Sequence, residues 1–233
     1  MIFALNEIEG MKAVLPRIRK EWLDEILVID GGSTDGSIEY CRSLGLNVLV
    51  QKKNGAVNGL REGFEAIGSD YVITFSPDNN MIPEILPALI AKLREGYDMV
   101  IVSRYLNGAK SADDSLVSGF GNWLFTGMVN VLFGARYTDV LGFYRGYRVD
   151  LLRELDVDLT TAIDTILCIR CTQNKLKVCE IPGDEPKRIG GTTKRSIIYH
   201  GWVELVTIMS EFLKPKKIFF VQKAEGRAYV KNG

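Results

Sequence analysis

The sequence has few of the residues that build zinc sites. Its 233 residues include one histidine, His200, and four cysteines. Cys168 and Cys171 have C-x-x-C spacing, but a structural zinc ion needs two further ligands at matching spacing. The scarcity of such ligands argues against a zinc site. We expect the two cysteines to be reduced thiols in a buried helix of a cytosolic protein.

Net charge is also absent, because 29 basic residues balance 29 acidic ones. A neutral chain has no general attraction for nucleic acid, so we expect no nucleic-acid partner. The balance is uneven, however. Residues 187–233 carry ten Lys/Arg and three Asp/Glu, a net charge of +7, which leaves −7 for the rest. This asymmetry predicts an anionic partner near the C-terminal end.

Neither a secretory leader nor an uninterrupted apolar run of about 18 residues is visible, so we expect a cytoplasmic protein without a membrane span. Two helical patterns are nevertheless strongly apolar. Residues 118–134 are apolar nearly all round, and residues 196–213 are amphipathic and precede Lys214-Pro-Lys-Lys217. Such helices fit a buried position, a contact in a homo-oligomer, or peripheral contact with the cytoplasmic face of a membrane.

The first half of the chain alternates between short apolar runs and helical patterns. This alternation predicts βαβ units, and therefore an α/β fold with a mostly parallel sheet flanked by helices. The expected strands are 25–29, 47–50, 70–75 and 98–102, and the expected helices are 8–18, 37–44, 55–67 and 83–94.

Three polar groups follow these strands. Asp30 opens the turn Asp30-Gly-Gly-Ser-Thr-Asp-Gly36, Asp78 follows the strand at 70–75, and Ser103-Arg104 follows the strand at 98–102. Ligands of parallel sheets bind at the carboxyl ends of the strands, so these groups are candidates for one site. The glycine turn is neither a dinucleotide fingerprint nor a Walker loop.

Asp78 offers a hard oxygen ligand that suits Mg²⁺ or Mn²⁺, the expected cofactors. The bland alternative is a turn, because Pro, Asp and Asn are turn formers. The basic segment at residues 185–195 could close over a diphosphate, with Arg188 gripping phosphate oxygens in a bidentate manner.

Several of these pieces occur in a characteristic order. They are Ala4-Leu-Asn-Glu7, the 27–36 segment, Gly55 with Gly63-Phe64, Asp78 with Pro83-Glu84, Ser103-Arg104-Tyr105, Gly121-Asn122, Thr138-Asp139 with Tyr144-Arg145-Gly-Tyr-Arg148, and Arg188-Ile-Gly-Gly-Thr-Thr-Lys194. Together they resemble glycosyltransferase family 2, which has the Rossmann-like GT-A fold, on the branch of dolichyl-phosphate mannose synthase. The resemblance implies a GT-A domain over residues 1–195, followed by a C-terminal amphipathic helix and basic tail over residues 196–233.

The resemblance also implies roles for single residues. Those implied to bind the nucleotide-sugar donor are Asn6, Glu7, Asp30, Asp78, Arg104, Arg188 and Lys194. Asp30 and Glu7 would contact the nucleoside, and the basic residues would neutralise the diphosphate. Asp78 would hold the metal ion, with Asn80 in a neighbouring ligand position.

The sequence departs from the family pattern in two places that matter. The metal motif is usually D-x-D, but here Ser76 stands in place of the first acid. In the synthases an arginine and a serine hold the lipid phosphate, and Ser115 and Gly119 occupy those positions here. The acceptor therefore stays open between a polyprenyl phosphate and a glycan hydroxyl. A hydroxyl needs a general base, for which Asp164 is the candidate.

The expected activity is metal-dependent, inverting transfer of a sugar from a UDP- or GDP-sugar to one of these acceptors. Two alternatives stay open. A non-catalytic binding or scaffold protein would account for the missing acid at Ser76. A sugar-1-phosphate nucleotidyltransferase would need a Gly-rich, Arg-containing loop near the first strand, and residues 4–10 contain none.

Overall fold

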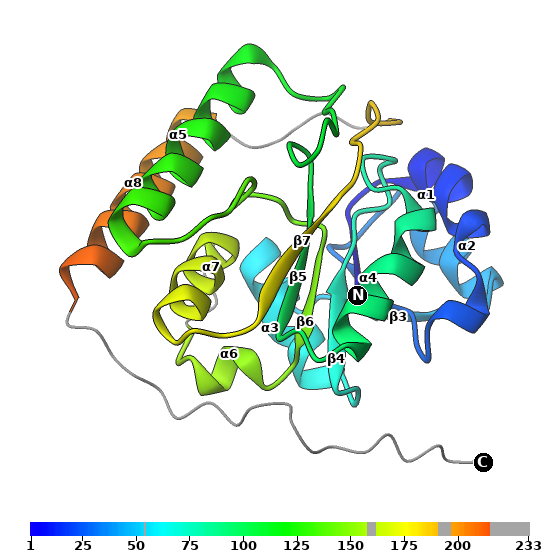
Figure 1. The fold of residues 1–233 in the computed structure, drawn as a ribbon. Helices are drawn as coiled ribbons and strands as arrows, with labels where there is room; N and C mark the ends of the chain where they lie inside the picture. Colours follow the sequence, from blue (N-terminus) through cyan, green and yellow to red (C-terminus); the bar gives the residue numbers. More distant parts are fainter. Residues whose placement is uncertain (54, 158–161, 191–196, 215–233) are drawn as a thin grey trace.

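The computed structural model describes residues 1–53, 55–157, 162–190 and 197–214 (Figure 1). A central sheet is covered by helices on both faces. Its strands are β1 (Ile2–Ala4), β2 (Leu27–Asp30), β3 (Asn47–Val50), β4 (Tyr71–Thr74), β5 (Met99–Ser103), β6 (Arg145–Arg148) and β7 (Val178–Pro182). The α-helices are α1 (Ile8–Val14), α2 (Ser37–Ser43), α3 (Ala56–Ala66), α4 (Leu86–Arg94), α5 (Leu116–Phe133), α6 (Leu151–Glu154), α7 (Ile163–Gln173) and α8 (Ile197–Leu213).

The strands run in the order β3-β2-β1-β4-β6-β5-β7. β1 joins the two halves of this order, since the N–H of Phe3 donates to the carbonyl of Phe75 at 3.0 Å and the N–H of Phe75 donates to the carbonyl of Met1 at 3.0 Å. Among the described strands only β6 is antiparallel to its neighbours. The predicted α/β fold with a mostly parallel sheet is therefore confirmed.

The elements predicted in the first half are present, with small shifts at their ends. The helix expected over residues 8–18 leaves α geometry after Val14 and continues as a 3₁₀ turn, Leu15–Arg17, that contains Pro16. Proline has no N–H to donate within an α-helix, which explains the early end. The helix expected from Pro83 likewise begins as a 3₁₀ turn, Pro83–Ile85, before α4.

The second half contains elements that the sequence pattern did not reveal, namely β6, β7 and α6. α7 was expected only as a buried helix around the two cysteines, and Cys168 and Cys171 are indeed fully buried there as free thiols. Burial raises the pKa of Cys168 to about 12, so this thiol is not poised for redox chemistry. α7 is buried on several sides and has no polar stripe, so its sequence shows no amphipathic periodicity.

α5 and α8 lie side by side and pack on α7 (Figure 1). Phe133 meets Phe212 edge to face, and Ile208 of α8 is fully buried in the core. The Arg170–Glu211 ion pair, at 2.9 Å, ties α7 to α8. Ser115 caps α5 by accepting from the N–H of Ser118. By length and composition, α5 alone among the described helices could cross a membrane, a test that core helices also pass.

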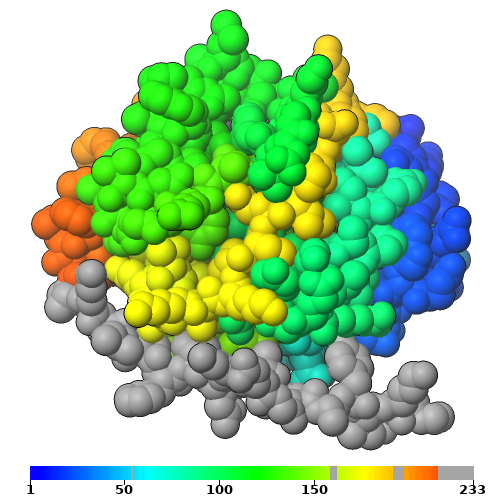
Figure 2. All heavy atoms as spheres, in the orientation of Figure 1, coloured from blue at the N-terminus to red at the C-terminus, as the bar shows by residue number. Residues whose placement is uncertain are grey.

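The outer faces of these two helices are apolar and exposed. In Figure 2 they lie together on one side of the molecule, in green and orange, opposite the blue N-terminal segment. The exposed large apolar side chains on them are Leu116, Val117, Phe120, Trp123, Leu124 and Val131 of α5, and Ile197, Ile198, Tyr199, Trp202, Val206, Met209, Phe212 and Leu213 of α8. We call this set the α5–α8 face.

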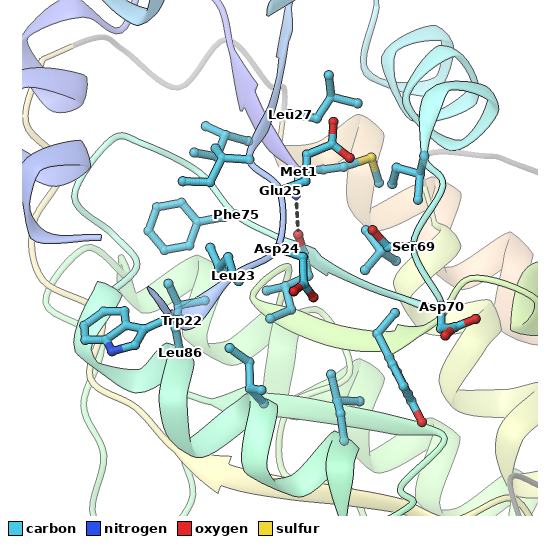
Figure 3. Close-up of a pocket in the computed structure, with 18 of the residues that line it drawn as sticks. Met1, Trp22, Leu23, Asp24, Glu25, Leu27, Ser69, Asp70, Phe75 and Leu86 are labelled. Carbon is cyan, nitrogen blue, oxygen red and sulfur yellow. Dashed lines mark hydrogen bonds between the residues drawn. The ribbon is translucent and has the colours of Figure 1, made fainter. Parts of the chain in front are cut away.

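A cavity of about 380 Å³ lies at the amino ends of β1, β2 and β4 (Figure 3). Met1 stands at its centre and donates from its amino group to the carbonyl of Ile73 at 2.8 Å. Apolar side chains such as Trp22 and Leu86 line it. Because ligands of parallel sheets bind at the carboxyl ends of the strands, this cavity is at the opposite edge from the candidate site.

Candidate active site

The turn after β2 is organised by Asp30. One carboxylate oxygen accepts from the N–H groups of Gly32 and Ser33, at 2.8 and 2.7 Å, and the other accepts from the Ser33 hydroxyl at 2.7 Å. The side chain is fully buried. Gly32 and Gly36 have positive φ angles of 92° and 93°, which glycine adopts without strain. Asp30 shapes this turn, and its predicted contact with a nucleoside stays a prediction.

Asn6 and Glu7, which follow β1, are joined to the same turn. The N–H of Asn6 donates to the Ser33 hydroxyl at 2.8 Å, and its side-chain carbonyl accepts from the N–H of Thr34 at 2.8 Å. The N–H of Glu7 donates to the Ser37 hydroxyl at 3.1 Å. The structure therefore brings together three residues that the sequence predicted for nucleotide binding: Asn6, Glu7 and Asp30.

The loop that carries Asp78 is held against the segment after β7. The N–H of Ile189 donates to the Asp78 carbonyl at 2.9 Å, and the Asn79 side chain donates to the carbonyl of Lys187 at 2.9 Å. On the other side Gly10 of α1 touches the loop so closely that a Cβ at this position would lie 2.4 Å from the carbonyl oxygen of Pro77. Glycine at position 10 thus allows the close approach of α1.

The side chains of this loop could hold a divalent cation. Asp78 is buried, with 4% of the residue exposed, and its carboxylate lies 3.2 Å from the guanidinium of Arg188. The buried Oδ1 of Asn80 has no hydrogen-bond partner among the described residues. In the described part of the chain, no group of three or more His, Cys, Asp or Glu side chains is arranged to hold a metal ion. A cation shared with a diphosphate needs only one or two protein carboxylates, so these residues fit Mg²⁺ or Mn²⁺.

Arg104 lies at the end of β5 in a network of acids that the sequence did not reveal. Its guanidinium donates to both oxygens of Asp139, at 2.7 and 2.9 Å, and also lies near Glu185 and Asp114. Burial lowers the pKa of Arg104, but the Asp139 carboxylate outweighs this effect and the pKa is raised. The guanidinium is therefore engaged by Asp139, and its predicted contact with a diphosphate stays a prediction.

Asp164 is the first acid of α7 and lies beside β6. Its carboxylate is 3.1 Å from Nε of Arg145, a fully buried arginine that also donates to the carbonyls of Gly142 and Val140. Glu204 of α8 accepts from the Thr165 hydroxyl at 2.7 Å. Burial raises the pKa of Glu204 to about 7, and the nearby charge of Asp164 adds to this rise. Asp164 thus pairs with Arg145 of β6, and its predicted role as a base is untested.

Lys194, the remaining residue predicted to bind the donor, lies outside the described residues. The other predicted residues meet at the carboxyl ends of β1, β2, β4, β5 and β7. The residues that the prediction missed are acids from later loops, above all Asp113 and Asp139. The Thr138-Asp139 motif was a signal for the second, whereas no motif pointed to Asp113.

Comparison with known proteins identifies the family and the fold. The family model described as "Glycosyl transferase family 2" matches residues 1–156. The chain belongs to glycosyl transferase family 2. It is 30% identical over 181 residues to the glycosyltransferase AglJ of Haloferax volcanii, covering 76% of this chain and 59% of that protein.

Two further relatives in this family are named for lipid-linked sugars, which supports the branch of dolichyl-phosphate mannose synthase. A dolichyl-phosphate hexose transferase of Haloferax volcanii is 27% identical, over 80% of this chain and 82% of that protein. An undecaprenyl-phosphate mannosyltransferase of Micrococcus luteus is 28% identical, over 82% and 84% of the two chains.

Solved structures support the GT-A fold. Glucosyl-3-phosphoglycerate synthase from Mycobacterium tuberculosis, in complex with Mn²⁺, UDP and phosphoglyceric acid, superposes with a TM-score of 0.70. The match covers 92% of this chain and 78% of that one, at 20% identity. At this identity the likeness concerns the fold alone.

Proposed function

We propose that this protein is a metal-dependent, inverting glycosyltransferase that moves a sugar from a UDP- or GDP-sugar to a polyprenyl phosphate. The observation that carries the proposal is the junction of the Asp78 loop with Arg188, at the carboxyl edge of a GT-A sheet. At this junction the carboxylate of Asp78, the proposed ligand of the cation, lies 3.2 Å from the guanidinium of Arg188, which can bind a diphosphate. The relatives named for dolichyl and undecaprenyl phosphates support the acceptor.

In this proposal the residues on the two sides of the site have separate tasks. Asn6, Glu7 and the Asp30 turn form the nucleoside side of the site. Asp78 and Asn80 would hold Mg²⁺ or Mn²⁺, which stabilises the leaving diphosphate when it is bound. Arg188 neutralises the remaining diphosphate charge. The acceptor oxygen forms a bond to the anomeric carbon as the bond to the diphosphate breaks, so the configuration inverts.

A phosphate acceptor is already anionic and needs no general base, so positioning and charge stabilisation supply most of the rate. Asp164 would act as a base only if the acceptor were a hydroxyl. With a phosphate acceptor, the Asp164–Arg145 pair instead fixes the start of α7 against β6.

We further propose that the α5–α8 face lies on the cytoplasmic surface of a membrane. The face has many exposed apolar side chains, including Trp123 at 69% and Trp202 at 64% exposure, and large exposed apolar patches mark interaction sites. A polyprenyl phosphate is held in a membrane by its chain. The sequence that follows α8 begins Lys214-Pro-Lys-Lys217, which suits anionic lipid. The alternative is that a second copy of this chain covers the same face in a homo-oligomer.

Release of the nucleoside diphosphate tests the proposed reaction. UDP- and GDP-sugars are incubated with undecaprenyl or dolichyl phosphate in detergent, with Mn²⁺, with Mg²⁺ or with EDTA. We expect release of either UDP or GDP, but not of both. The release should require both the metal ion and the lipid phosphate. Release that needs no acceptor would indicate a hydrolase, and the absence of binding to either nucleotide would favour a scaffold protein.

A further inference from the structure

The metal motif of this chain supplies only one carboxylate, that of Asp78, because Ser76 replaces the first acid of the family's motif. The structure brings a second carboxylate to the same place. Asp113, from the loop after β5, accepts from the side-chain amide of Asn80 at 3.0 Å. The residue is 33 positions away from Asn80 in the chain, and nothing in the sequence connects the two.

Asp113 also meets the arginine that faces Asp78. The backbone N–H of Arg188 donates to one oxygen of Asp113 at 3.4 Å, and the side-chain Nε of Arg188 lies 3.9 Å from the other oxygen. Nη2 of the same guanidinium lies 3.2 Å from Asp78. One cationic group thus lies near two carboxylates from different loops. The buried Nε has no hydrogen-bond partner among the described residues, so the arrangement leaves this group incompletely satisfied.

The hydrogen bond from Asn80 to Asp113 has a second consequence. It engages the nitrogen of the Asn80 amide and leaves the buried Oδ1 without a partner in the described parts of the chain. A buried acceptor without a partner destabilises the folded protein, unless a ligand supplies one. Two carboxylates and an amide oxygen form an all-oxygen donor set, which is the kind that Mg²⁺ and Mn²⁺ prefer.

We infer that Asp113 is the second carboxylate of the cation site, replacing the acid missing at Ser76, and that Arg188 is the counter-ion of Asp78 and Asp113 until a metal ion binds. This inference rests on the proposed function, and it adds a residue and an order of events to it. A metal ion alone must displace Arg188 from both acids. A nucleoside diphosphate gives Arg188 a new anionic partner, so metal and nucleotide bind cooperatively.

Binding of Mn²⁺ tests the inference without a turnover assay. Free Mn²⁺ is measured by electron paramagnetic resonance, with the metal alone and with UDP or GDP. We expect Asp113→Asn to weaken Mn²⁺ binding in the presence of the nucleotide by about tenfold or more, the usual effect of losing a group that supports a metal site. Asp113→Glu restores the carboxylate and should recover most of the affinity. Asp150→Asn removes an equal charge from the start of α6 and should change the affinity less than twofold.

Arg188→Met tests the counter-ion. We expect it to strengthen the binding of Mn²⁺ alone several-fold and to remove the gain in Mn²⁺ affinity that the nucleotide brings. An unchanged affinity for Mn²⁺ alone in this variant contradicts the counter-ion role. Circular dichroism and thermal melting of every variant confirm that it is folded.

The outcomes separate this inference from the proposed function. If Asp78→Asn loses Mn²⁺ binding while Asp113→Asn keeps it within twofold, Asp113 is not part of the site, and the glycosyltransferase proposal stands. If the unchanged protein binds no Mn²⁺ with either nucleotide, the metal-dependent reaction itself is wrong, and the inference falls with it.

Discussion

The two halves of the molecule are held together in different ways. On the nucleotide side, the turn after β2 is built from short-range hydrogen bonds: Asp30 bonds to residues two and three positions ahead, and Asp35 bonds to Ser37. From the end of β5 onward, buried charges pair over long separations, as in Arg104–Asp139 after β5 and Arg170–Glu211 between α7 and α8. The structure of the first half can therefore be predicted from local sequence, whereas the structure of the second half depends on packing between distant segments.

The halves also differ in their surfaces. Glycines and turn residues surround the candidate nucleotide site, whereas the α5–α8 face presents large apolar side chains to its surroundings. Such a face is costly in water, since each exposed large apolar side chain forgoes about 1.5–3 kcal/mol of burial. This difference supports the proposal that one half binds a polar donor and the other contacts an apolar partner.

The largest expected effect comes from breaking the cation site on the nucleotide side. Asp78→Ala should lower metal-dependent release of the nucleoside diphosphate by about 10³-fold, because a charge that stabilises the leaving group is lost. The fold should persist, since the substitution touches only a loop. Steady-state kinetics at saturating Mn²⁺ measure the loss. Turnover equal to that of the unchanged protein would remove Asp78 from the mechanism.

Breaking a buried pair in the second half should cost folding stability instead. Asp139→Asn leaves the guanidinium of Arg104 without its bidentate partner in a buried place, so we expect the free energy of unfolding to fall by about 3 kcal/mol. Urea denaturation measures the change. The surface pair Arg17–Glu84 is the matched control, and Glu84→Gln should cost less than about 1 kcal/mol. Equal losses in both variants would contradict the contrast.

Glu204 should make stability depend on pH. Its pKa is about 7 in the folded protein and about 4.3 in an unfolded chain. Between these values the folded state holds a proton that the unfolded state has lost, so the free energy of unfolding falls as the pH rises through this window. The charged groups that face it are Asp164 of α7 and Arg145 of β6.

Glu204→Gln keeps an acceptor for Thr165 but cannot ionise. We expect this variant to exceed the unchanged protein in stability by about 2 kcal/mol at pH 8, and to match it near pH 4.5. The estimate lies below the full 1.4 kcal/mol per pKa unit because solvent screens part of the charge. Thermal melting at the two pH values measures the difference. Parallel pH profiles for the two proteins would show that Glu204 ionises normally.

The smallest expected effect concerns the α5–α8 face. Replacing Trp123 and Trp202 together by Gln should weaken binding to vesicles that contain anionic lipid by about tenfold, because two large apolar groups no longer enter the interface. Co-sedimentation measures the partition. Leu44→Gln, on the opposite side at the end of α2, is the control. If the double variant instead changes the oligomeric state in light scattering, the face is a contact between copies.

Much of the nucleotide half could be predicted from the sequence. The strand bounds at 47–50 were correct, and the strand-end positions of Asp30, Asp78 and Arg104 were correct as well. Short apolar runs that alternate with helical patterns indicate parallel strands, because both faces of such a sheet are buried. β6 was missed because Arg145-Gly-Tyr-Arg148 is polar in sequence, although the guanidinium of Arg145 is buried among backbone carbonyls.

The sequence by itself determined the family, the positions of the early strands along the chain, and which loops carry glycine, carboxylate and basic groups. Each of these depends on short-range patterns, in which the residue type directly limits the backbone. Only the tertiary structure decided that Asp113 stands beside Asn80, that Asp139 occupies Arg104, and that α5 shares its apolar face with α8. These pairings join residues far apart in the chain, and their geometry is set by how the helices and sheet pack together.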